Sequence, residues 1–154
     1  MKKYKGVIAF DFDGVIHSYD KGWHDGSIYG KANTEVLQLM QDLMDKGYPV
    51  FIFSTRSPWQ IKSWMSEQYP WFGAMAYDME YDRHFQTGGR EVKVIPFWKK
   101  FWNTTKYLGV TKRKLPATHY IDDRAVLFTG NVNELKKELP PTDRPPSRPQ
   151  REEK

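Results

Sequence analysis

Short apolar segments alternate with longer amphipathic segments along this chain. Residues 6–10 and 50–53 are apolar runs with β-branched and aromatic side chains, and both runs are too short for buried helices. We therefore expect two buried strands there, a third at residues 120–121 and a further one at residues 74–77. Because strands alternate with helical segments, the pattern predicts an α/β domain with a mainly parallel sheet.

Helix signals separate the predicted strands. Asn33 or Thr34 caps a helix whose apolar positions repeat at helical spacing, and Gly47 ends that helix. The stretch SPWQ, from Ser57, is a capping box with proline at the first helical position, and the helix it opens runs to about Gln68. Three further elements are expected: a hairpin around Gly88 and Gly89, a helix over residues 96–108, and a short helix beginning at Asn131.

Length and composition favour one folded domain. The chain has 154 residues, of which 39% are hydrophobic, so it is long enough to bury a sizeable core. It contains no cysteine, which excludes disulfides, zinc–thiolate sites and thiol nucleophiles. No apolar run approaches the roughly 18–20 residues that span a bilayer, and Asp11 interrupts the first apolar stretch too early for a signal peptide. We expect a cytoplasmic protein that has no membrane contact.

The expected domain covers residues 1–139, with residues 81–108 as a small hairpin-and-helix insert. From Pro140 onward, five of the fifteen residues are proline and most of the others are charged. This composition is typical of a disordered or polyproline-like tail, which we place at residues 140–154.

The net charge of +5 is concentrated in one region. Residues 81–114 hold nine lysine and arginine residues against two acidic residues, which suggests an anionic partner. Because Trp98, Phe101 and Trp102 lie beside two lysines, this region is a candidate nucleic-acid surface. The alternative, which we favour at this point, is an amphipathic helix that buries its aromatic side chains while its lysines face water.

Carboxylates follow the predicted strands. Asp11 and Asp13 come at the end of the first strand, and Asp122 and Asp123 follow the strand at residues 120–121. Since the carboxyl ends of parallel strands meet at one edge of a sheet, we expect these side chains to converge there. Converging carboxylates repel one another unless they share a cation, and Mg²⁺ prefers oxygen ligands of this kind. The sequence therefore predicts a Mg²⁺ site.

Such a site is suited to phosphoryl transfer. One carboxylate can attack phosphorus to form an acyl-phosphate, while a second, two residues further on, protonates the leaving oxygen. Mg²⁺ neutralises developing charge. The hydroxyl of Ser54, which follows the strand at residues 50–53, can hold a phosphoryl oxygen, and a lysine can balance the remaining charge.

Motifs in this order resemble those of the haloacid dehalogenase superfamily of phosphohydrolases. The segments are DFDGV after the first strand, FIFSTR at the end of the next, and KLPATHYIDDRA further on, within residues 7–128. The resemblance implies a Rossmann-like three-layer sandwich and a Mg²⁺-dependent phosphatase that works through an aspartyl-phosphate. The segments between the motifs are too short for a full cap domain, so the chain looks like a capless or minimally capped member.

The resemblance also implies a role for each motif residue. Asp11 would be the nucleophile, and Asp13 the general acid and base that also offers its backbone carbonyl to the metal. The family also has a phosphate-binding lysine. Lys114 is the candidate favoured here, and only by its spacing to the last motif. The alternative candidates are Lys93, Lys99, Lys100 and Lys112. The remaining roles are phosphate binding by Ser54 and by the backbone amide of Thr55, and metal binding by Asp122 and Asp123.

Three of these side chains have simpler interpretations. Taken alone, Ser54 could merely end a strand. For Arg56, contact with substrate and a surface ion pair are equally good interpretations. His17, in the loop over the site, is as well explained by loop packing as by substrate contact.

The expected substrate is a phosphorylated small molecule or a phosphorylated nucleic-acid end. We favour a nucleotide or nucleic-acid end because the basic region lies beside an uncapped site. The alternative from another class is a non-catalytic module that binds nucleic acid or protein, because a fold does not fix a function.

Overall fold

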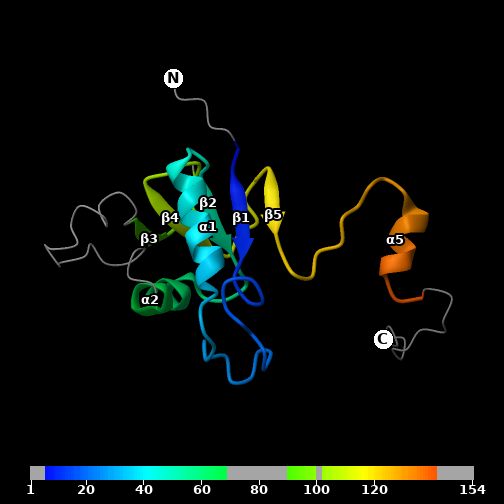
Figure 1. Ribbon diagram of the computed structural model, residues 1–154, viewed down its shortest axis with the longest axis horizontal. Coiled ribbons are helices and arrows are strands. Elements are labelled where there is room, and N and C mark those ends of the chain that lie inside the picture. Colours follow the sequence, from blue (N-terminus) through cyan, green and yellow to red (C-terminus); the bar gives the residue numbers. More distant parts are fainter. Residues whose placement is uncertain (1–5, 69–89, 100–101, 142–154) are drawn as a thin grey trace, which may run out of the picture. The chain divides into compact units, whose positions relative to one another are not determined.

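Five strands form one parallel sheet in the computed structural model, which describes residues 6–68, 90–99 and 102–141 (Figure 1). The strand order across the sheet is β3-β4-β2-β1-β5, and every neighbouring pair is parallel. An α/β architecture with a parallel sheet is therefore present, as predicted. The strands are β1 (Ile8–Asp11), β2 (Val50–Phe53), β3 (Glu91–Val94), β4 (Tyr107–Thr111) and β5 (His119–Ile121).

Both faces of the central strands are buried, and their side chains alternate between two clusters. In β1, Phe10 packs on one face while Ala9 packs on the other, and in β2 Ile52 and Phe51 alternate in the same way. This burial on both faces explains why the strands read as continuous apolar runs in the sequence.

Two helices contribute to the first of these clusters. They are α1 (Thr34–Asp45), which the side chain of Asn33 caps by accepting a hydrogen bond from the Val36 amide, and α2 (Pro58–Gln68). The buried side chains of α1 and α2 share one cluster with the strands: Leu37, Met40, Met44, Ile61, Trp64 and Met65.

The second cluster is closed by loop residues in the part of the chain that the structure describes. Ile95 and Leu115 are buried against Ala9 and Phe51 there, and Trp102 packs beside them. Gly109 allows this packing, because a Cβ atom on it would lie 2.5 Å from Ile95 Cδ1. The second helical layer of a three-layer sandwich is not among these described residues and stays a prediction.

The prediction of a helix over residues 96–108 is wrong for the residues of that range that the structure describes. Residues 96–99 form a turn, and Tyr107 and Leu108 begin β4. Leu108 and Val110 are both fully buried, so the apolar spacing that suggested a helix includes the start of a strand. β3 and the beginning of β4, which fall in the range expected to be an insert, belong to the central sheet. The predicted elements at residues 74–77 and at Gly88 and Gly89 lie outside the described residues.

The chain divides into two units, Met1–Asp123 and Arg124–Lys154, and the sheet belongs to the first. In the second, α5 (Val132–Glu138) begins after Asn131, whose side chain accepts hydrogen bonds from the amides of Asn133 and Glu134. Most of the Pro-rich segment predicted as a tail lies outside the described residues. Among the described helices, none has the length and apolar character required to cross a bilayer.

Candidate active site

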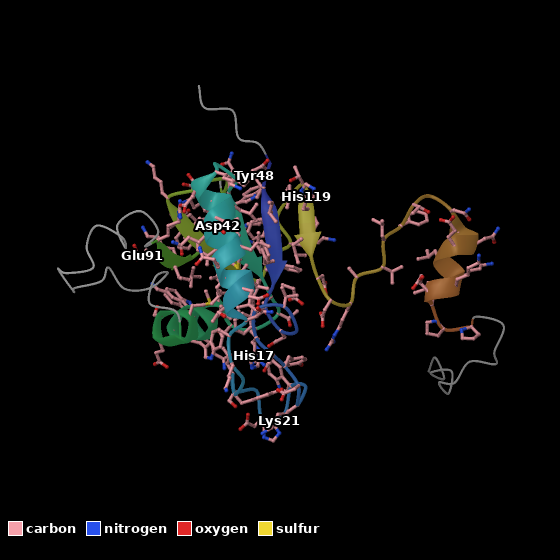
Figure 2. All side chains as sticks on the ribbon, in the orientation of Figure 1. His17, Lys21, Asp42, Tyr48, Glu91 and His119 are labelled. Carbon is pink, nitrogen blue, oxygen red and sulfur yellow. The ribbon has the colours of Figure 1, made fainter. Side chains whose placement is uncertain are left out.

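Three carboxylates meet at the carboxyl edge of the sheet. Asp11 is the last residue of β1, while Asp122 and Asp123 directly follow β5, which pairs with β1. One carboxylate oxygen from each of the three lies within 4.8 Å of the others. Figure 2 shows His17 and Lys21 in the loop beyond this edge, whereas Tyr48 and His119 lie at the opposite end of the strands. The parallel pairing thus brings together residues more than a hundred positions apart.

The environment of Asp11 disfavours its charge. Its pKa is raised to about 6, mainly by burial and then by the negative charges of Asp122, Asp123 and Asp13. A hydrogen bond of 2.8 Å from the Phe12 amide to Asp11 Oδ1 opposes this shift but does not cancel it. A divalent cation among the three carboxylates would relieve the repulsion, and an all-oxygen donor set suits Mg²⁺. The residues present therefore fit the predicted ion.

Gly14 leaves the space that Asp123 occupies. Its φ of +85° is a conformation that glycine adopts readily, and a Cβ atom there would lie 2.2 Å from Asp123 Oδ2. The Gly14 amide donates a hydrogen bond of 2.8 Å to the His17 carbonyl, which closes the turn after β1. The glycine of the DFDGV motif is thus required by close packing against the last motif.

The side chain of Asp13 is held apart from the three grouped carboxylates. Arg56 Nε donates to both of its oxygens, at 2.9 and 2.7 Å, and His17 Nδ1 lies 2.9 Å from Oδ1. The Gly30 amide donates to His17 Nε2 at 2.8 Å, so Nε2 is an acceptor and Nδ1 carries the proton donated to Asp13. Asp13 is therefore oriented by two neighbouring side chains.

Arg56 is buried and is not a surface ion pair. Only 1% of it is exposed, its Nη1 donates to the Gly26 carbonyl at 2.7 Å, and its Cζ lies 4.6 Å from the centre of the Trp23 ring. Gln60 on α2 donates to the same Gly26 carbonyl at 2.9 Å. Arg56 thus joins Asp13 to the loop over the site.

His17 is also buried, with 1% exposed, and its ring lies against those of Phe12, Tyr29 and Trp64. Loop packing accounts for these contacts, so a contact of His17 or Arg56 with substrate stays a prediction. The sequence did not predict that Gln60 and Arg56 both donate to the Gly26 carbonyl. The local signals at these positions are a capping box for Gln60 and a loop rich in aromatic residues for Gly26.

Ser54 and Thr55 follow β2, next to the end of β1. Ser54 is 4% exposed, its amide donates to the Thr111 carbonyl at 3.1 Å, and its Oγ accepts from the Arg56 amide at 3.2 Å. Since that oxygen accepts from the protein, its own proton can be donated to another oxygen atom. Thr55 is exposed at the same edge. Both positions are compatible with phosphate binding.

Lys114 lies in the connection between β4 and β5. The side chain is exposed, and its Nζ lies 5.0 Å from the centre of the Tyr120 ring. This cation–π contact with Tyr120 does not indicate phosphate binding. The phosphate-binding role of Lys114 therefore stays a prediction.

Comparisons with known proteins do not assign a family. No family model matches the chain, and no solved structure matches it. One curated protein, a biosynthetic peptidoglycan transglycosylase from Methylobacillus flagellatus, is 31% identical over 71 residues. The match covers 43% of this chain and 28% of that protein, so the chain spans less than a third of the length of this relative.

Mg²⁺ should raise the thermal unfolding temperature of the full chain by several degrees at pH 7.5. The increase should be smaller at pH 5, where Asp11, with its pKa of about 6, is mostly protonated. Differential scanning fluorimetry with and without chelator measures this shift. Asp122→Asn should reduce it and Asp42→Asn, an exposed aspartate on α1, should not. An unchanged unfolding temperature at both pH values would contradict the cation site.

Asp11→Asn should stabilise the metal-free protein at pH 7.5 by about 1–2 kcal/mol, a value reduced for the partial exposure of the group. The raised pKa of Asp11 means that the native state loses stability as pH rises from about 4 to about 6, and asparagine removes this loss. Urea unfolding in chelator should show the gain at pH 7.5 and its disappearance near pH 4. A variant less stable than the wild type at pH 7.5 would contradict the repulsion.

Arg56→Ala should destabilise the fold by about 3 kcal/mol, because it leaves the Asp13 carboxylate without its main partner in a largely buried setting. Arg90→Ala is the matched control, because Arg90 also pairs with an aspartate, Asp45. The side chain of Asp45 is 43% exposed, whereas that of Asp13 is 16% exposed. Exposed pairs contribute about 0–1 kcal/mol. Urea unfolding that gives equal losses for the two variants would refute the distinction.

Proposed function

We propose that the chain is a Mg²⁺-dependent phosphomonoester hydrolase of the haloacid dehalogenase type. The observation that carries the proposal is the division of the acidic residues into two groups. Asp11, Asp122 and Asp123 share one small space, whereas Asp13 is turned to Arg56 and His17. This division matches the two roles that phosphoryl transfer through an acyl-phosphate requires, a nucleophile beside a metal and a separate proton donor.

In the first step, a carboxylate oxygen of Asp11 attacks phosphorus and the bond from phosphorus to the leaving oxygen breaks. Asp13, which must start this step in its protonated form, gives its proton to that oxygen, which departs as an alcohol. Ser54 donates a hydrogen bond to a non-bridging phosphoryl oxygen, and the backbone amide of Thr55 donates to a second one. Mg²⁺, when held by Asp11, Asp122 and Asp123, supplies positive charge that offsets these carboxylates and the phosphoryl oxygens.

In the second step, water attacks the phosphorus of the aspartyl-phosphate. Asp13, now a carboxylate, takes the proton of this water, and the bond between Asp11 and phosphorus breaks. Inorganic phosphate leaves and both aspartates return to their starting forms. Arg56 and His17 keep the carboxylate of Asp13 in one orientation through both steps, which is a positioning role.

The proposed substrate is a nucleotide or a phosphorylated nucleic-acid end. The support is the order and context of the DFDGV, FIFSTR and IDDRA segments and the basic region that follows β2 in the chain. A transglycosylase activity is not proposed, because the 71-residue match covers only 28% of that relative.

Phosphate release should require both Asp11 and Mg²⁺. With a panel of mononucleotides, sugar phosphates and oligonucleotides phosphorylated at either end, we expect turnover that chelator abolishes. Asp11→Asn should lower turnover by at least about a thousandfold, since it removes the nucleophile, and should leave the fold intact because the Phe12 amide keeps its acceptor. Asp42→Asn is the control. Full activity of Asp11→Asn would exclude the aspartyl-phosphate route.

A further inference from the structure

Two large aromatic side chains stand exposed after β3. Phe97 is 77% exposed and Trp98 is 71% exposed, and their rings meet edge to face with centres 5.0 Å apart. A helix that buries these rings, which the sequence had favoured, is not formed at these residues. An adjacent exposed pair of this size is a candidate binding surface.

The turn that carries this pair is fixed to the end of β4. The Lys99 amide donates to the Pro96 carbonyl at 3.0 Å, which closes the turn. Arg113, two residues after β4, donates from Nη2 to the carbonyls of Pro96 and Lys99 at 2.9 and 3.4 Å. The aromatic pair therefore has a defined place beside the carboxyl end of β4.

Positive charge surrounds this turn. Residues 95–99 and 112–118, which follow β3 and β4, contain four lysine and arginine residues and no acidic residue. Lys99 Nζ lies 4.8 Å from the centre of the Tyr107 ring and donates to its hydroxyl, while Lys112 is exposed just after β4. Aromatic rings interleaved with cations in this way suit a polymer that offers both bases and phosphates.

The sheet places this surface in line with the candidate active site. Because all five strands are parallel, the segments after β3 and β4, Ser54 after β2 and Asp11 at the end of β1 all occur at the carboxyl edge. β3 lies three strand positions from β1, which is about 14 Å at about 4.8 Å per strand. A mononucleotide at Asp11 is too short to fill this interval, whereas a strand of a few nucleotides is long enough.

We infer that a single strand of nucleic acid binds along this edge, with its bases stacked on Phe97 and Trp98 and its backbone beside Lys99 and Lys112. We call these four residues the strand surface. The placement of a terminal phosphate at Asp11 rests on the proposed function, whereas binding of the strand does not. Unpaired bases are required, since paired bases do not present their faces for stacking.

Binding tests the strand surface without any hydrolysis. Fluorescence anisotropy with labelled oligothymidine of about 12 nucleotides, in chelator, should show that Trp98→Ala weakens the Kd about tenfold. Lys112→Ala should lower the salt dependence of the Kd. Leu39→Ala and Lys46→Ala are controls, because Leu39 is an exposed apolar side chain on α1 and Lys46 follows the end of that helix.

Three results would overturn the inference: an unchanged Kd for Trp98→Ala, equal binding of the matching duplex, or equal competition by an acidic peptide of the same charge. The last result would identify a surface for acidic proteins. Because Trp98 is exposed, its replacement should leave the unfolding temperature unchanged, and this is measured on the same samples.

Kinetics separate the strand surface from the proposed function. Trp98→Ala should raise the KM for phosphorylated oligothymidine about tenfold and leave that for thymidine monophosphate unchanged. If oligothymidine binds through Trp98 but no substrate releases phosphate, the proposed function fails and the strand surface stands. If phosphate is released and the KM for the oligonucleotide does not depend on Trp98, the strand surface fails and the proposed function stands.

Discussion

The repulsion among Asp11, Asp122 and Asp123 is the constraint on which the site depends. Parallel pairing of β1 with β5 brings these carboxylates together, and burial together with their mutual charge raises the pKa of Asp11 to about 6. The three carboxylates are placed so that they could share a cation, and that cation would join the ends of two neighbouring strands.

The side chain of Asp13 lies outside this group of carboxylates and is held by other partners. Its carboxylate accepts hydrogen bonds from Arg56 and His17, so it is turned to a different set of partners from those of Asp11. Arg56 in turn donates to Gly26, in the loop that also carries Trp23. The guanidinium group of Arg56 thus links Asp13, the candidate general acid and base, to the loop over the site. Arg56 itself follows the end of β2. A change in the loop would reach Asp13 through Arg56.

The sequence predicted those features that local patterns determine. β1, β2 and both helices of the first unit follow from short apolar runs, capping residues and helical spacing, and the burial of Ile61, Trp64 and Met65 on α2 is confirmed. β4 was missed because Leu108 also fits a helical spacing with Phe97 and because Gly109 weakens the apolar run. The burial of Arg56 could not be predicted, since its partner Asp13 is 43 positions away and no local pattern records that contact.

Two of the three grouped carboxylates follow β5, an edge strand of the sheet. All three side chains of β5 are exposed, so this edge strand contributes little to the core and is held by its pairing with β1. At the other edge, β3 and the turn after it are fixed by the hydrogen bonds of Arg113 and by packing of Ile95 over Gly109. The carboxyl edge of the sheet therefore has a basic and aromatic end after β3 and β4, and an acidic end after β1 and β5. A negatively charged strand that contacts the basic end first would bring its terminal phosphate to the acidic end, where only a bound cation makes that approach favourable.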